Sequence, residues 1–274
     1  MTLVQPHPGR PHTVVDGPEQ VRRVVRELVR AGADVIKVAT SGGVLSARDD
    51  PRHGHFRDEE VAMMVAEATA AGIGVMAHAQ AADGIKVAVR NGVRSIEHGI
   101  YLDDEAIELM LDWGTWLVPT LAAPRVVLDL AGAGVPYPDA VLAKAKMVLE
   151  VHAESVRRAI EAGVTVALGT DSGVGPHGHN LQELALLTEC GMTPAQALHA
   201  ATGSASELLD LAEDRGTVAP GQRADLVVVD GDALDVRTLR DRIRGVYPDG
   251  ILVAGPALDR PGSAAPPGSA ARPA

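Results

Sequence analysis

The sequence predicts an α/β protein in which helices alternate with the strands of a parallel sheet. Two observations between about residues 17 and 172 support this prediction. Segments with apolar residues at helical spacing alternate with short, continuously apolar runs, which is the pattern of βα units. A glycine follows most of the helical segments, as expected where a helix ends and the chain turns toward the next strand.

The helices are predicted from their periodicity and their ends. Residues 18–31 place valines and a leucine at helical spacing, begin at Asp16-Gly17-Pro18 and end at Gly32. The same reasoning predicts further helices over residues 58–71, 82–90, 103–113 and 143–162.

The strands are predicted from apolar runs between these helices. The runs are too short for helices and too continuously apolar for a half-exposed sheet, so they indicate buried parallel strands. With the helices they make five successive strand–helix units, and they cover residues 35–39, 75–77, 93–96, 116–121 and 164–168.

The pattern changes after Asp171. Helices are expected over residues 181–189 and from Thr193-Pro194 onward, and residues 223–230 and 243–253 indicate a small β element with a turn at Asp249-Gly250. We therefore divide the chain into a (β/α) part at 1–212, a small β part at 213–255, and a tail rich in Pro, Gly, Ser and Ala at 256–274, which we expect to be disordered.

Composition excludes several classes of protein. The net charge of -11 disfavours a nucleic-acid or anionic-membrane partner. The single cysteine, Cys190, cannot form an internal disulfide, and no apolar stretch approaches the roughly 18 residues that span a bilayer. The first twelve residues lack the pattern of a secretory signal, so we expect a cytoplasmic protein.

Ionisable residues interrupt or follow four of the predicted strands: Lys37, His78, His98 and Asp171. Groups at the carboxyl ends of parallel strands converge on one crevice, where active sites form. Each residue alone also has a structural interpretation: an edge or snorkelling lysine, a hydrogen-bonded histidine, or an aspartate that caps a turn. Their recurrence at successive strand ends favours a shared site.

A divalent metal site would use this set of residues. Neutral imidazoles and a carboxylate suit zinc or a similar ion, which acidifies bound water and polarises a carbonyl. A cationic lysine is a poor ligand. Burial would lower the pKa of Lys37, and reaction of its free amine with carbon dioxide would give an anionic carbamate able to bridge two ions.

Short motifs follow one another along the predicted strands: VIKV with TSGG at 35–43, AHA at 77–79, SIEHG at 95–99, LVPT at 117–120 and LGTDS at 168–172. In this order they resemble strands four to eight of the amidohydrolase superfamily, and most closely its prolidase-like and imidazolonepropionase-like members. The resemblance spans about residues 16–255 and includes the β-sandwich strands of those enzymes near residues 216–228. It implies a partial TIM barrel with a remnant of a small β-sandwich domain.

The resemblance implies a role for each strand-end residue. Lys37 would be a carboxylated bridging ligand, His78 and His98 would bind the second of up to two metal ions, with zinc expected, and Asp171 would bind the first. A metal-activated hydroxide would attack an amide or lactam carbonyl of a small substrate, such as an Xaa-Pro dipeptide or a cyclic amide. Asp171 would then act as general base and general acid.

Two further residues are candidate substrate contacts. His177 follows the last strand motif closely enough to reach a substrate, and Tyr101 lies three residues beyond His98. The alternatives are an ordinary loop histidine and a tyrosine that packs beside the strand end. Within predicted helices, His152 and His199 are expected on solvated faces.

The chain departs from the family pattern at its start. The family begins its barrel with His-x-His, yet no such motif occurs in the first 37 residues, where His7 and His12 are too far apart; His53-Gly54-His55 and His177-Gly178-His179 fall elsewhere. Eight strands are needed to close the barrel, and five are predicted. A mis-started or truncated copy, a decayed gene product, and a chain completed by a partner or a second copy are the three explanations.

Two functions therefore stay open at this stage. The first is a hydrolase of carbon–nitrogen bonds, and the second is a noncatalytic remnant or a subunit that needs a partner. The exposed sheet edges of an open barrel would invite pairing, so a homo-oligomer is a further expectation.

Overall fold

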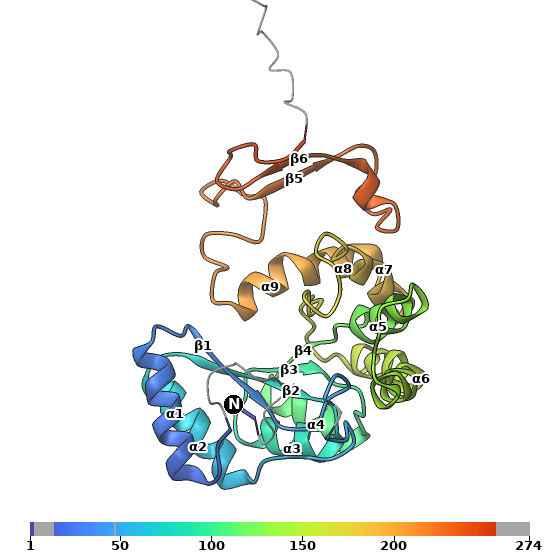
Figure 1. Ribbon diagram of the computed structural model, residues 1–274. Helices are drawn as coiled ribbons and strands as arrows, with labels where there is room; N and C mark the ends of the chain where they lie inside the picture. The colour runs from blue at the N-terminus through green and yellow to red at the C-terminus, as the bar shows by residue number, and fades with distance from the viewer. Residues whose placement is uncertain (3–13, 47, 256–274) are drawn as a thin grey trace, which may run out of the picture.

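A computed structural model describes residues 1–2, 14–46 and 48–255 and confirms an α/β fold with a parallel sheet (Figure 1). In this part of the chain, one sheet has the order β1-β2-β3-β4 with every neighbouring pair parallel. Its strands are β1 (Val35–Ala39), β2 (Gly74–Ala79), β3 (Ser95–His98) and β4 (Trp116–Val118). The proposed tail at 256–274 and the histidines at 7 and 12 lie outside the described residues.

Helices α1 to α4 pack beside one another and against this sheet, because each presents an apolar stripe to it. In α1, for example, Val21 and Val25 are fully buried, while its arginines face solvent. The core is aliphatic, as the scarcity of aromatic residues requires. The four helices are α1 (Pro18–Arg30), α2 (Asp58–Ala70), α3 (Ala82–Arg90) and α4 (Asp104–Trp113).

The prediction of a fifth strand at residues 164–168 is wrong. The segment forms an isolated parallel bridge between Leu117 and Val166, held by backbone bonds from Leu117 to Thr165 and from Ala167 to Leu117. The next amide, that of Leu168, donates to Ala200 rather than to the sheet. The segment lies beside β4 but leaves the sheet before a ladder forms.

Two helices, α5 (Ala122–Gly132) and α6 (Asp139–Ala162), separate β4 from this bridge. The sequence patterns predicted only part of α6 and none of α5. Beyond Asp171 lie α7 (Gln182–Glu189), α8 (Pro194–Ala201) and α9 (Gly203–Leu208), of which α9 was not predicted. Among the described residues, no helix has the length and hydropathy needed to cross a membrane.

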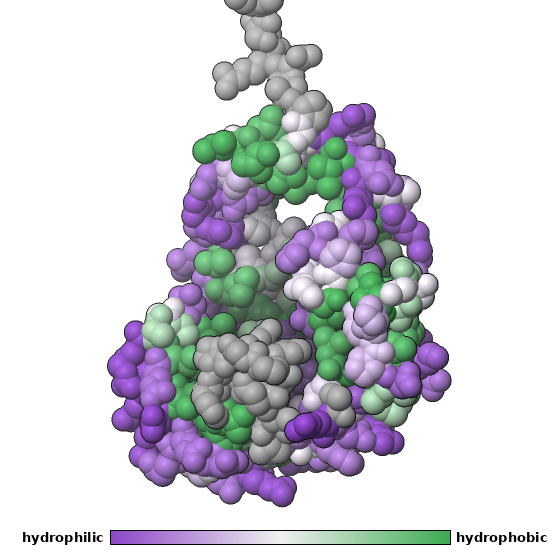
Figure 2. Space-filling view, viewed as in Figure 1, coloured by the Kyte–Doolittle hydropathy of each residue, from purple (hydrophilic) through white to green (hydrophobic). Residues whose placement is uncertain are grey.

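The small β element forms an antiparallel pair, β5 (Leu226–Val229) and β6 (Ile243–Tyr247), with the 3-10 helix η1 (Leu239–Arg242) before β6. Its turn residues Asp249 and Gly250 both have left-handed backbone, as the sequence indicated. Figure 2 shows apolar residues gathered over this hairpin, where Val227, Ile251 and Val253 are each more than half exposed. The division of the chain at residue 212 stays a prediction.

One buried acid connects α7 to the start of α5. The Glu183 side chain is fully buried, and its carboxylate accepts hydrogen bonds from the backbone N–H groups of Leu121 at 2.6 Å and Ala122 at 2.9 Å. These are unpaired donors at a helix N-terminus, where a negative charge is favoured. Burial nevertheless outweighs the two bonds and raises the pKa of Glu183 to about 7.

We expect Glu183 to make the free energy of unfolding fall as the pH rises from about 4.5 to 7. In this window the folded protein holds a proton that the unfolded chain releases, because the folded pKa lies above the unfolded one. The decrease should reach at most about 3 kcal/mol. Urea unfolding across this range should show it in the wild type, and Glu183→Gln, which cannot titrate there, should lack this component. Parallel pH profiles for the two proteins would contradict the prediction.

Candidate active site

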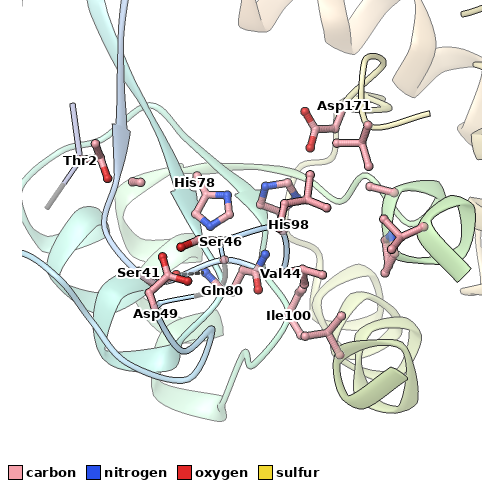
Figure 3. A pocket seen from close by; sticks show the side chains of 18 of the residues that line it. Thr2, Ser41, Val44, Ser46, Asp49, His78, Gln80, His98, Ile100 and Asp171 are labelled. Atoms are coloured by element: carbon pink, nitrogen blue, oxygen red, sulfur yellow. Dashed lines mark hydrogen bonds between the residues drawn. The ribbon is translucent and has the colours of Figure 1, made fainter. Parts of the chain in front are cut away.

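A cavity of about 510 Å³ lies at the carboxyl ends of the sheet strands. Lys37 of β1, His78 of β2, His98 of β3 and Asp171, which follows the isolated bridge, all line it. Figure 3 shows the two imidazole rings next to each other, with the Asp171 carboxylate on the far side of His98 in this view. The fold therefore brings the four strand-end residues to one site.

The proton position on His78 follows from its hydrogen bond. Its Nε2 lies 3.1 Å from the carbonyl oxygen of Gly42, which can only accept, so Nε2 carries the proton and Nδ1 keeps its lone pair. The adjacent Gly43 lets the loop approach the ring, because a Cβ there would come within 3.2 Å of the imidazole. The two glycines of this loop thus help to fix the orientation of His78.

His98 reaches the cavity through an unusual backbone conformation. In the strand register, His78 pairs with Glu97 and Ala79 pairs with His98, so alternation alone would send His98 to the opposite face from His78. The backbone of His98 is left-handed, with φ 76°, which rotates its side chain relative to the preceding strand. The two ring centroids are then 4.5 Å apart in an edge-to-face arrangement.

A hydroxyl fixes the proton of the second ring. His98 Nδ1 lies 2.6 Å from Thr120 Oγ1, and that hydroxyl donates its own proton to the carbonyl of Pro119 at 2.7 Å. Thr120 therefore accepts from Nδ1, which leaves the lone pair of His98 on Nε2. Thr120 itself has φ 54°, a strained conformation for a β-branched residue.

Both imidazoles are neutral near pH 7. Burial lowers the pKa of His78 to about 4, although its bond to Gly42 opposes this effect. Burial lowers the pKa of His98 still further, and the neighbouring His78 and Lys37 act in the same direction. Each ring can therefore offer a lone pair.

Lys37 lies near two carboxylates: Asp171, which lines the cavity with it, and Glu97, which is buried outside the cavity lining. Much of the Lys37 side chain is open to solvent. Partial desolvation nevertheless lowers its pKa, and the negative charges of Glu97 and Asp171 oppose this effect. Burial raises the pKa of Glu97, which accepts a hydrogen bond from Ser95 at 2.7 Å, and burial also raises the pKa of Asp171. The backbone of Asp171, like that of His98, is left-handed, with φ 51°.

The two candidate substrate contacts lie apart from these groups. His177 is exposed on the loop after Asp171 and is not among the residues that line the cavity. Tyr101 is half-buried outside the lining as well, and its hydroxyl has no hydrogen-bond partner among the described residues. Burial raises the pKa of this tyrosine.

The cavity wall includes residues that sequence reasoning missed, and two of them are Gln80 and His152. Gln80 is buried two positions after His78, and its Oε1 is unpartnered within the described chain. His152 of α6 was expected on a solvated face, which is wrong: only 1% of it is exposed. The signal was present, because Val148, His152, Val156 and Ala159 follow one apolar stripe of the helix.

The donor set fits one divalent ion in part. His78 and His98 are neutral, have defined tautomers and lie side by side, as imidazole ligands require. Lys37 would have to become a carbamate before it could bind. Within residues 1–2, 14–46 and 48–255, no group of three or more His, Cys, Asp and Glu side chains is arranged to hold a metal ion.

Comparison with known proteins adds independent information. The model of the amidohydrolase family matches residues 2–255. Ochratoxinase from Aspergillus niger is 36% identical over 265 residues, which cover 93% of this chain and 54% of that protein. Imidazolonepropionase from Deinococcus deserti is 36% identical over 180 residues, or 64% of this chain and 39% of that enzyme.

Solved structures agree with these matches. The crystal structure of an Xaa-Pro dipeptidase with bound methionine in the active site has a TM-score of 0.84 and 37% identity, and covers 88% of this chain and 60% of that one. The ochratoxinase structure has a TM-score of 0.79 at 35% identity, and covers 94% and 60% of the two chains.

The chain spans little more than half the length of the ochratoxinase and dipeptidase chains that it matches. The amidohydrolase family generally uses divalent metals. The family match over almost all of the described residues agrees with the fold and with the cavity at the strand ends. The chain therefore belongs to the amidohydrolase family.

Proposed function

We propose that this protein contributes to a metal-dependent hydrolase that cleaves carbon–nitrogen bonds in small substrates, such as Xaa-Pro dipeptides or cyclic amides. The observation that carries the proposal is the pair of neutral, edge-to-face imidazoles at His78 and His98, in one cavity with Lys37 and Asp171. The similarity to an Xaa-Pro dipeptidase and to an ochratoxinase supports this reaction class.

His78 Nδ1 and His98 Nε2 would hold the second of two ions, together with Lys37 as a carbamate, and Asp171 would hold the first ion through its carboxylate. Zinc is the ion that imidazole and carboxylate ligands suit best, with one or two ions in a complete site. When bound, the ion would acidify water and polarise the carbonyl of the substrate.

The lowered pKa of Lys37 favours carbamate formation. A lowered pKa increases the fraction of the Lys37 amine that is uncharged, and only the free amine adds to carbon dioxide. The nitrogen forms the new C–N bond and releases one proton to solvent. Together with the proton that the ammonium loses to become the free amine, two protons leave, and the charge changes from positive to negative.

Asp171 is suited to move the proton. Burial raises its pKa, which brings this carboxyl closer to the range where it can both accept and release a proton near neutral pH. Asp171 would take a proton from the attacking water and deliver it to the leaving nitrogen. His177 and Tyr101 are proposed as contacts for the outer part of the substrate.

The alternative function is a noncatalytic chain, or a subunit that needs a partner. This alternative stays open from the sequence, and the chain covers 54% of the ochratoxinase and 60% of the dipeptidase chain. A cytoplasmic location and a homo-oligomer also stay predictions from the sequence.

Asp171→Asn should lower kcat for an Xaa-Pro dipeptide or cyclic amide by about 10²- to 10⁴-fold, because the amide cannot accept the proton. Lys37→Ala should have an effect of similar direction. Initial rates over a dipeptide and lactam panel, with zinc or manganese and bicarbonate present, measure both changes.

Asp210→Asn is the matched control for this substitution. Asp210 is also a left-handed aspartate, with φ 57°, but it is exposed and pairs with Arg94 away from the cavity. Its substitution should leave hydrolysis unchanged. Unchanged hydrolysis in Asp171→Asn and Lys37→Ala would rule out the enzymatic proposal, and absence of hydrolysis in the wild-type chain would favour the alternative function.

The purified chain should bind at most one equivalent of zinc or manganese tightly, through Lys37, His78 and His98. Metal analysis after equilibrium dialysis should show less bound metal in His78→Ala and His98→Ala, while His199→Ala, an exposed histidine of α8, should match the wild type. Bicarbonate should strengthen binding in the wild type and leave Lys37→Ala unaffected. Two tightly bound equivalents would disprove the single-site prediction.

A further inference from the structure

His152 contacts the site from outside the strands. It lies on α6, is 1% exposed, and its Nε2 is 2.9 Å from the backbone carbonyl oxygen of His98. A carbonyl can only accept, so Nε2 carries the proton of this bond. The residue thus connects a helix to the backbone of one strand-end histidine.

The bond is made at the place where the backbone is strained. The left-handed φ of His98 is energetically unfavourable and persists only where surrounding contacts hold it. Thr120 holds the ring of His98 through Nδ1, and His152 holds its carbonyl group. The two contacts fix the side chain and the main chain of the same residue.

A contribution to the stability of the fold does not by itself explain why position 152 is a histidine. The Nδ1 atom of His152 is buried and makes no hydrogen bond within the described chain. Burying an unpaired polar atom destabilises the fold, and a leucine of similar volume would avoid this cost. A leucine would, however, leave the carbonyl of His98 without this donor.

We propose that His152 is a positioning residue, which holds the backbone of His98 in the left-handed conformation that directs its imidazole toward His78. This inference rests on the proposed function for its consequence, metal binding, but the geometry that it describes can be measured in the metal-free protein. Its place on α6 makes that helix part of the site's support.

The first experiment follows the ring protons of the metal-free chain. In ¹⁵N-histidine NMR, the Nδ1–H proton of His98, which the short bond to Thr120 shifts downfield and protects from exchange, should be visible in the wild type and absent in Thr120→Val. It should be lost or broadened in His152→Leu. It should persist in His152→Gln, whose amide nitrogen can replace Nε2 as the donor.

The second experiment measures binding of Co²⁺ alone, by titration and by the visible absorption of the bound ion. His152→Leu should weaken affinity by about 10- to 100-fold, the usual effect of losing a contact to a ligand, and His152→Gln should remain within about threefold of the wild type. Ser155→Ala is the matched control. Ser155 is also on α6, and its hydroxyl donates a hydrogen bond of 2.5 Å to the backbone carbonyl oxygen of Ile100.

The outcomes separate the two proposals. Wild-type ring signals and cobalt affinity in His152→Leu would overturn the positioning role, as would equal losses in Ser155→Ala, which would indicate only that α6 had shifted. If the wild-type chain binds no cobalt, the proposed function fails and the ring signal still decides the role of His152. If His152→Leu does not fold, His152→Asn, whose amide is too short to reach the same carbonyl, replaces it.

Discussion

The site depends on the backbone conformation of His98 more than on any other feature. In a regular strand, the side chain of His98 would lie on the other face of the sheet from that of His78. The left-handed φ of His98, the last residue of β3, brings the two rings to one cavity. That conformation is supported by Thr120, in the segment between β4 and α5, and by His152 of α6. Packing of α6 and of the segment after β4 against the end of β3 is therefore a condition for the geometry of the site.

The strand and helix pattern could be predicted because it depends on local sequence. The limits of β1 and α3 were correct, since continuous apolar residues and helical spacing define them. Residues 164–168 have the same apolar character but pair with β4 only at Val166. Whether such a run completes a ladder depends on its neighbours in space, and its own sequence does not contain that information.

The four strand-end residues could be predicted for a similar reason, because parallel topology alone brings them to one edge. The supporting residues could not. His152 was misplaced because a single histidine in a helix is usually solvated, and its role depends on the carbonyl that it meets 54 positions away in sequence. The left-handed backbone of Thr120 gives no signal in its residue type, since β-branched residues normally avoid that region.

Desolvation shifts the pKa values of several groups of this site in directions that favour metal binding and proton transfer. It lowers the pKa of both imidazoles, which keeps their lone pairs available near pH 7, and it lowers the pKa of Lys37, which increases the fraction of free amine. Desolvation also raises the pKa of Asp171, the proposed base. The neutral imidazoles of His78 and His98 would hold a metal ion, and conversion of the Lys37 amine to a carbamate would replace a positive charge beside them with a negative one. Desolvation at this site thus shifts the pKa values of the proposed ligands and of the proposed base together.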